Sequence, residues 1–265
     1  MIESGPLAGK DLHELWSRNR SAVFGVEYEL HPAPRFPILI KILDARERLS
    51  VQVHPPGHLA SELGGEPKTE VWYFMDADNG ARVYAGLRCD TTREEFATKL
   101  GSGNVESLLH EIPVQAGESI FIPSGRLHAI GEGNLIVEVQ QNSDTTYRVF
   151  DWNRTGLDGA PRTLHIEESL RSIDFLDVEA TVAPATAPII ADCPYFRVER
   201  IVVEGQVDPR PTGRFAIIAV VAGAVSCGAE VMPRGSVFLL PASDQAILLG
   251  PCEPDTQILV ITLPT

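Results

Sequence analysis

The chain has 265 residues, of which 44% are hydrophobic and 22% charged, a balance typical of globular proteins and enough for one large or two modest domains. Its formal net charge of -14 disfavours nucleic acid and anionic membrane surfaces as partners, so an anionic substrate would need locally placed cations. Four widely spaced cysteines, no signal-peptide pattern and no long apolar window predict a cytoplasmic protein with free thiols.

The first half of the chain predicts a short helix followed by several strands. Residues 10–18 place apolar side chains at helical spacing, and residues 36–54 contain two β-branched apolar runs separated by a charged turn. Further strand patterns lie at 70–76, 81–86, 118–122 and 135–140. Short strands separated by Gly and Pro turns are typical of a sandwich or barrel.

The second half predicts a domain boundary and another all-β unit. Residues 92–112 read as a helical insertion opened by a capping box, and 165–173 as a third helix. A Pro, Ala and Thr stretch at 178–189 reads as an extended linker. We therefore predict a metal-binding domain with helical insertions at 1–177, a linker at 178–189 and a C-terminal β domain without metal at 190–265.

An internal similarity supports two copies of one β-fold. A glycine, five residues and a proline occur from Gly117 to Pro123 and again from Gly235 to Pro241. The second copy has no histidine near its proline, so the metal chemistry is expected in the first domain alone.

Four side chains from separate segments are candidate metal ligands. Gln52 and His54 lie two positions apart in SVQVHP and so project from one face of a strand, while Glu70 opens the strand of KTEVWYF. His128 ends a Gly-x5-Pro-x-Gly-x2-His pattern, which resembles the second sequence motif of the cupin family. Two imidazoles, a carboxylate and an amide suit one Zn²⁺ per chain, with Mn²⁺, Fe²⁺ or Co²⁺ possible in the same shell.

The chain resembles type I mannose-6-phosphate isomerases over residues 36–154 and, more weakly, over 190–265. The matching stretches are FPILIKILDARERLSVQVHP, KTEVWYF and FIPSGRLHAIGEGNLIVEVQQNSDTTYRVFDWNR. The resemblance implies a mainly β, double-cupin jelly-roll fold with a small helical insertion. It also implies a zinc enzyme that takes a small-molecule sugar phosphate and interconverts mannose 6-phosphate and fructose 6-phosphate through a metal-stabilised cis-enediol.

The resemblance also assigns roles to individual residues. It implies that the four candidate ligands hold the metal, that Arg148 is the catalytic arginine, and that Ser50 and Arg154 bind the substrate phosphate. Lys68, Glu138 and Asp144 are implied as acid/base or positioning groups. Glu138 lies between apolar neighbours that would desolvate it and raise its pKa, but the sequence does not choose the base among these three.

Two other functions remain open from the sequence. One is a metal-dependent cupin oxygenase, which the glutamine ligand and the polar run QQNSDTTYR disfavour. The other is a non-catalytic sugar-phosphate-binding cupin. Retention of Arg148, Lys68 and all four ligands argues against it, because binding alone would not require the whole set.

Overall fold

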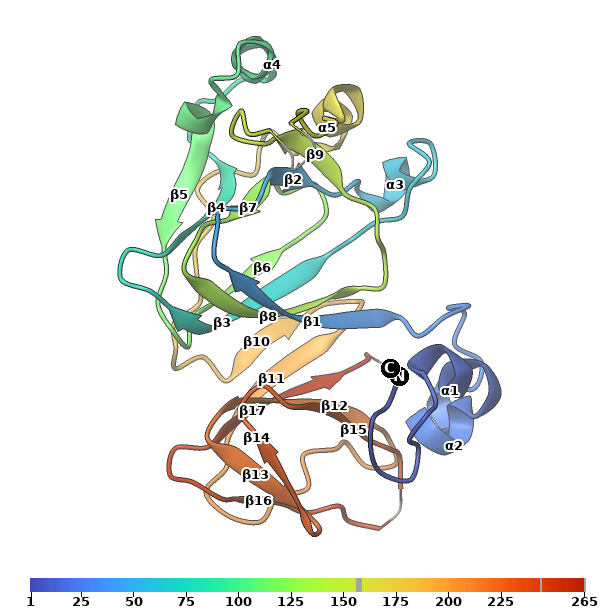
Figure 1. Cartoon of the computed structure of the whole chain (residues 1–265). Helices are drawn as coiled ribbons and strands as arrows, with labels where there is room; N and C mark the ends of the chain where they lie inside the picture. Colours follow the sequence, from blue (N-terminus) through green and yellow to red (C-terminus); the bar gives the residue numbers. More distant parts are fainter. Residues whose placement is uncertain (156–158, 244, 265) are drawn as a thin grey trace. The chain divides into compact units, whose positions relative to one another are not determined.

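The computed structural model describes residues 1–155, 159–243 and 245–264. Internal contacts divide the chain into two compact units (Figure 1). The barrel unit comprises Ile40–Thr186, and the two-segment unit combines Met1–Leu39 with Ala187–Thr265. Strands dominate both units, as the sequence predicts.

Two sheets of the barrel unit enclose a common core. The four-stranded sheet has the order β1 (Ile38–Ala45), β8 (Asn134–Gln141), β3 (Glu70–Ala77) and β6 (Ser119–Ile122). The five-stranded sheet has the order β5 (Leu109–Pro113), β4 (Arg82–Leu87), β7 (His128–Ile130), β2 (Val51–Val53) and β9 (Tyr147–Phe150). Trp72, Phe74 and Ile120 of the first sheet pack with Val83 and Ile130 of the second. The inner faces of both sheets therefore line one interior.

Helices cover the outer face of the five-stranded sheet. They are α4 (Arg93–Gly101), the 3-10 helix η2 (Val105–Leu108) and α5 (Ile166–Ser172), while the short helix α3 (Gly57–Ala60) follows β2. Phe96 and Leu100 of α4 belong to the same apolar cluster as Val51 and Val53 of β2. Because side chains alternate along a strand, Gln52 between these valines is directed to the barrel interior.

The helical insertion is shorter than the sequence pattern suggests. The Thr92 side chain accepts a hydrogen bond from the Glu95 N–H and opens α4, as the capping box predicts. Residues 109–113, however, form strand β5 and pair with β4. Sheet pairing supplies their backbone hydrogen bonds, and a local apolar pattern does not reveal such a partner.

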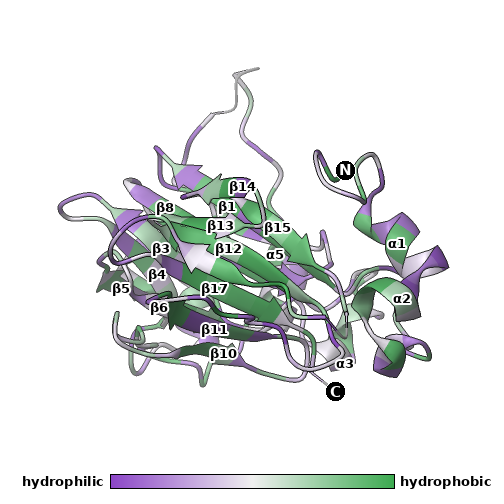
Figure 2. Cartoon of the chain, turned by 90° about the horizontal axis from the view of Figure 1, so that it is seen from below, coloured by the Kyte–Doolittle hydropathy of each residue, from purple (hydrophilic) through white to green (hydrophobic). Residues whose placement is uncertain are grey.

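The two-segment unit contains three short helical elements and eight strands among its described residues. The helices are α1 (Leu12–Arg18), α2 (Arg20–Phe24) and η1 (Val26–Tyr28). One sheet has the order β10 (Ile189–Asp192), β11 (Arg197–Val202), β17 (Gln257–Thr262), β12 (Ala216–Ala222) and β15 (Val237–Leu240). The other has the order β14 (Glu230–Pro233), β13 (Ala224–Cys227) and β16 (Leu249–Pro251). β12 and β17 are hydrophobic over most of their length (Figure 2).

The two units differ from the predicted domains at the N-terminus. The Phe24 ring lies 5.0 Å from the Phe215 ring, and the Tyr28 hydroxyl donates to the Leu263 carbonyl at 3.0 Å. Residues 1–39 therefore pack with the C-terminal strands rather than with the rest of 1–177. An aromatic residue carries no local mark of a partner about 190 positions away, so the sequence pattern misses this packing.

The segment predicted as a linker is in contact with the barrel unit over much of its length. Val178 and Ala183 form isolated bridges with Leu87 and Ser119, and Ala180 is buried. Backbone pairing rather than apolar periodicity orders these residues, so the composition of the segment does not reveal the contact. In the described part of the chain, we find no helix with the length and apolarity needed to span a bilayer.

Candidate metal centre and active site

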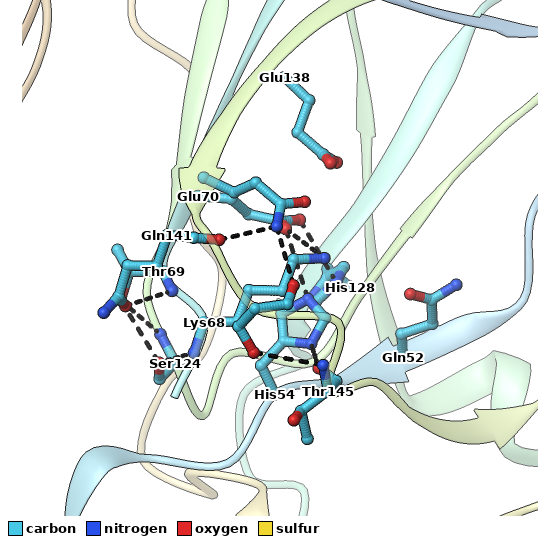
Figure 3. Close-up of polar contacts among 12 residues, drawn as sticks. Gln52, His54, Lys68, Thr69, Glu70, Ser124, His128, Glu138, Gln141 and Thr145 are labelled. Carbon is cyan, nitrogen blue, oxygen red and sulfur yellow. Dashed lines mark hydrogen bonds and ion pairs between the residues drawn. The ribbon is translucent and has the colours of Figure 1, made fainter. Parts of the chain in front are cut away.

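Two histidines and one glutamate converge in the interior of the barrel unit. His54 follows β2, Glu70 opens β3 and His128 opens β7. Their ligand atoms lie within 4.8 Å of one another, and all three side chains are buried (Figure 3). The structure therefore brings together three of the four predicted ligands, which lie up to 74 positions apart in the sequence.

The nitrogen and oxygen atoms of this cluster that could bind a metal face one another but do not hydrogen-bond to one another. Glu70 Oε2 lies 3.4 Å from His54 Nε2, and Glu70 Oε1 lies 3.6 Å from His128 Nε2. His54 Nε2 and Glu70 Oε2 are buried and make no hydrogen bond with good geometry. A tetrahedral ion with bonds of roughly 2.0–2.1 Å separates its ligand atoms by about 3.4 Å. The observed spacing and the unsatisfied atoms fit a bound cation.

Backbone carbonyls orient both imidazole rings. His54 Nδ1 lies 3.0 Å from the Thr145 carbonyl oxygen, and His128 Nδ1 lies 2.8 Å from the Arg126 carbonyl oxygen. A carbonyl can only accept, so each Nδ1 carries the hydrogen. This arrangement directs Nε2 of each ring toward Glu70 and is usual for metal-binding histidines.

Burial and nearby charges set the ionisation of this cluster. Burial, reinforced by His54, lowers the pKa of His128 to about 3, so His128 is neutral near pH 7 and its Nε2 offers a lone pair. Burial by itself would raise the pKa of Glu70, but His54, Lys68 and His128 outweigh it and lower that pKa. The result is an ionised carboxylate beside a neutral imidazole, a set that suits a divalent ion.

Gln52 and Arg148 lie on the same inner face as the histidines. Gln52 is paired across the sheet with His128 of β7 on one side and with Arg148 of β9 on the other. The Gln52 amide donates to the Ser50 hydroxyl at 3.1 Å, which leaves the amide carbonyl as its acceptor group. Figure 3 shows Gln52 beside the His54, Glu70 and His128 cluster.

Arg148 is half-buried and only partly engaged. Its Nη1 donates to the Thr163 carbonyl at 2.8 Å, while its Nε is buried without a hydrogen-bond partner. The His165 ring nitrogen Nδ1 accepts from the Arg148 backbone N–H at 3.1 Å, and the His165 N–H donates to the Arg148 carbonyl. These contacts with His165 hold the backbone of Arg148 in place.

Lys68 and Glu138 are both buried near Glu70. Lys68 Nζ lies 3.1 Å from Glu70 Oε2. The Trp72 indole N–H lies 3.0 Å from Glu70 Oε1 and 3.2 Å from Glu138 Oε2. Lys41 Nζ donates to Glu138 Oε1 at 2.9 Å. Trp72 thus connects Glu70 to a second buried carboxylate.

The environment of Glu138 raises its pKa. Burial is the largest cause, and the nearby Glu70 charge adds to it, whereas Lys68 and Lys41 oppose it. This direction agrees with the expectation from the apolar neighbours of Glu138 in the sequence. The sequence motifs do not single out Lys41 or Trp72. Lys41 stands in an otherwise apolar strand, FPILIKIL, and a cation at such a position was a usable signal.

The remaining predicted residues lie toward the loops of the barrel unit. Ser50 is buried next to β2. Arg154 Nη1 donates to the Arg48 carbonyl at 2.8 Å, and Arg154 Nη2 donates to Asp151 Oδ1 at 2.7 Å. Asp144 is exposed between β8 and β9, and the structure does not bring it into the His54, Glu70 and His128 cluster.

Comparisons with known proteins give a consistent result. Residues 2–85 match the family model of phosphomannose isomerase type I, catalytic domain. A mannose-6-phosphate isomerase of Streptococcus mutans is 37% identical over 255 residues, covering 91% of this chain and 78% of the relative. The crystal structure of the mannose 6-phosphate isomerase from Bacillus subtilis superposes with a TM-score of 0.83 at 30% identity, covering 98% of this chain and 84% of that one.

A more distant structure bears on the fold alone. A mannose 6-phosphate isomerase solved in a zinc-bound form has a TM-score of 0.73 and 15% identity, covering 97% of this chain and 86% of that chain. The similarity to these structures confirms the predicted fold class, mainly β and cupin-like.

Proposed function

Since the chain belongs to the type I mannose-6-phosphate isomerase family, we propose that it interconverts mannose 6-phosphate and fructose 6-phosphate. The relative from Streptococcus mutans and the buried His54, Glu70 and His128 cluster carry this proposal. The family match also favours an isomerase over an oxygenase or a non-catalytic binding protein.

The metal would be held by His54, Glu70 and His128, with Gln52 as the fourth ligand. Zinc is the ion named for one structure of the same fold, and two imidazoles with one carboxylate suit it. When bound, a divalent cation supplies Lewis-acid stabilisation of negative charge that develops on the sugar oxygens. Since Gln52 donates through its amide nitrogen to Ser50, its carbonyl oxygen is the atom available for this role.

The reaction moves one proton between neighbouring carbon atoms. A base removes the proton from C2 of the aldose while O1 gains a proton, which gives a cis-enediol. The proton then returns at C1 while O2 loses its proton, which gives the ketose. We assign the base to the Glu138 carboxylate. It is buried, its pKa is raised, and Lys41 and Trp72 hold its two oxygens in place. A carboxylate in such surroundings is a stronger base than one in water.

Lys68 and Arg148 are suited to stabilising negative charge on the sugar oxygens rather than to moving the proton between the carbon atoms. The Lys68 ammonium group carries donors only and lies beside Glu70, so it can donate to a sugar oxygen as charge develops there. Arg148 has a buried Nε without a partner on the inner face of the barrel unit, and a substrate oxygen would satisfy it. Asp144 remains a candidate for positioning substrate from its exposed loop.

The phosphate group would bind near Ser50 and Arg154. The Arg154 guanidinium donates to the carbonyl of Arg48, two positions before Ser50, so both candidates belong to the same edge of the site. A local cation is required there because the chain as a whole carries a charge of -14.

A coupled assay with mannose 6-phosphate tests the proposed function. We expect turnover by the metal-loaded protein, loss of turnover on chelation and recovery on adding zinc. Arg148→Ala should lower kcat about a hundredfold or more, because it removes charge stabilisation in the transition state. Arg171→Ala on α5 is the matched control and should retain wild-type kcat. Chelator-resistant turnover would remove the metal from the proposal, and unchanged turnover in Arg148→Ala would remove the arginine.

A further inference from the structure

We propose that Arg162 is a second phosphate-binding residue, held beside Arg154 by the carboxylate of Asp151. This inference rests on the proposed function, because it extends the phosphate site of a sugar-phosphate isomerase. It assigns a binding role to Arg162 and a positioning role to Asp151.

Asp151 holds both guanidinium groups at once. Arg162 Nε lies 2.7 Å from Asp151 Oδ2, and Arg162 Nη2 lies 2.5 Å from Oδ1. Arg154 Nη2 contacts the same Oδ1 at 2.7 Å. The two Nη2 nitrogens are therefore no more than about 5 Å apart, since they share one acceptor atom. That separation allows one phosphate group to contact both arginines.

Both arginines keep donors that a ligand can use. Each guanidinium has five N–H donors, and hydrogen bonds among the described residues use three on Arg154 and two on Arg162. The side chains of Arg154 and Arg162 are 31% and 44% exposed, whereas that of Asp151 is 7% exposed. The carboxylate thus lies beneath two cations whose free donors remain accessible.

The charge of this cluster fits an anion. Asp151 neutralises only one of the two guanidinium charges, and its pKa is lowered because hydrogen bonds from Arg162 and Arg154 outweigh the effect of burial. Glu47 approaches Arg154 at 3.9 Å but its side chain is 86% exposed, so it is a weak, solvent-screened partner. A phosphate monoester carries a charge of roughly -1.5 to -2 near neutral pH and would balance the excess.

Two backbone contacts connect the cluster to the rest of the site. The carbonyl of Thr163, next to Arg162, accepts from Arg148 Nη1 at 2.8 Å. Val51 pairs with Phe150, which places Ser50 and Asp151 at neighbouring ends of β2 and β9. The residue that follows Arg162 therefore contacts the proposed catalytic arginine, and Asp151, which holds Arg162, lies beside the candidate phosphate residue Ser50. A purely structural ion pair would not need a second arginine whose donors face solvent.

The test compares Arg162→Gln and Arg162→Lys with the wild type, using Arg171→Gln as the control. Arg171 is also a partly exposed arginine paired with one carboxylate, that of Glu62, but it lies on α5. The measurements are KM and kcat for mannose 6-phosphate, the inhibition constant of inorganic phosphate, and binding of both ligands to the metal-loaded protein by calorimetry. Thermal midpoints report any loss of stability separately.

We expect Arg162→Gln to raise KM, and the dissociation constants of mannose 6-phosphate and inorganic phosphate, by about tenfold or more. The kcat should change by less than about threefold, because the phosphate is remote from C1 and C2. Arg162→Lys should recover part of the affinity, since it keeps the charge but loses the planar fork. Arg171→Gln should leave every ligand affinity at its wild-type value.

Affinities within twofold of wild type in both Arg162 variants would overturn the inference, whatever their thermal midpoints. Should Arg162→Gln fail to fold, Arg162→Lys decides the question alone, because it retains the charge that Asp151 needs. Calorimetry measures phosphate binding without turnover, so it separates failure of the phosphate site from failure of the proposed isomerase activity. Wild-type protein that binds phosphate but does not turn over mannose 6-phosphate would refute the isomerase and leave the phosphate site standing.

Discussion

Replacing Trp72 with phenylalanine is predicted to weaken metal binding without removing any ligand. The Trp72 side chain is 1% exposed, and its single N–H is shared between Glu70 Oε1 at 3.0 Å and Glu138 Oε2 at 3.2 Å. Trp72→Phe leaves both carboxylates without this donor. It also removes the contact that keeps the Glu70 carboxylate in one orientation toward the two histidines.

The magnitude follows from the contacts that are lost. A hydrogen bond to a charged group contributes about 1.5–3 kcal/mol, and the smaller ring leaves a void that costs on the order of 1 kcal/mol more. We therefore expect the free energy of unfolding of the metal-free protein to fall by about 2–4 kcal/mol. Contacts that orient metal ligands typically contribute about 10–100-fold to metal affinity, so we expect a loss in that range.

The assay measures zinc affinity by competition with a chromophoric chelator, together with thermal unfolding of the metal-free protein. Trp16→Phe is the matched control, because the Trp16 N–H donates at 2.9 Å to the Ala33 carbonyl within the two-segment unit. The control should lose somewhat less stability, because the acceptor of its hydrogen bond is neutral, and should keep its zinc affinity. Zinc affinity in Trp72→Phe within about twofold of the control would refute the reasoning, even if stability falls as predicted.

Three further predictions concern charge and packing. Lys41→Met removes a contact that lowers the pKa of Glu138, so that pKa should rise in the variant. The acid limb of the profile of kcat against pH should then move to higher pH by about one unit. A limb that does not move would argue against Glu138 as the base. Asp151 has a lowered pKa in the folded protein, so its contribution to stability is present above its unfolded pKa and is lost as pH falls through the folded value. Asp151→Asn should therefore lower the thermal midpoint by a few degrees at pH 7, and this difference should shrink as the pH falls below the unfolded pKa of Asp. A difference that stays constant on acidification would contradict the ion pair. In Gly131→Ala the new Cβ would lie 2.3 Å from the Arg82 carbonyl oxygen. This clash should lower the free energy of unfolding, measured by a urea melt, by about 2 kcal/mol or more. Gly101→Ala is the control, because the space around Gly101 is open and the change should be neutral or slightly stabilising.

The residue types needed for the chemistry could be identified from the sequence because they lie at fixed short spacings. Gln52 and His54 alternate along one strand, and His128 ends a glycine and proline turn, so local geometry predicts their directions. Predictions of strands and of the α4 capping box are borne out for the same reason. Each depends on neighbours within a few positions of the chain.

The tertiary structure alone decided which distant groups meet. Lys41, Trp72 and Glu138 come together only because β1, β8 and β3 are adjacent in one sheet, and no periodicity in the chain encodes that order. The packing of residues 1–39 with the C-terminal strands has the same cause. Sequence by itself predicted candidate groups for a cation and a sugar phosphate, and the structure brings His54, Glu70 and His128 together. Sheet pairing and burial determined which carboxylate is desolvated and which cations lie beside it, because both effects act through space and not along the chain.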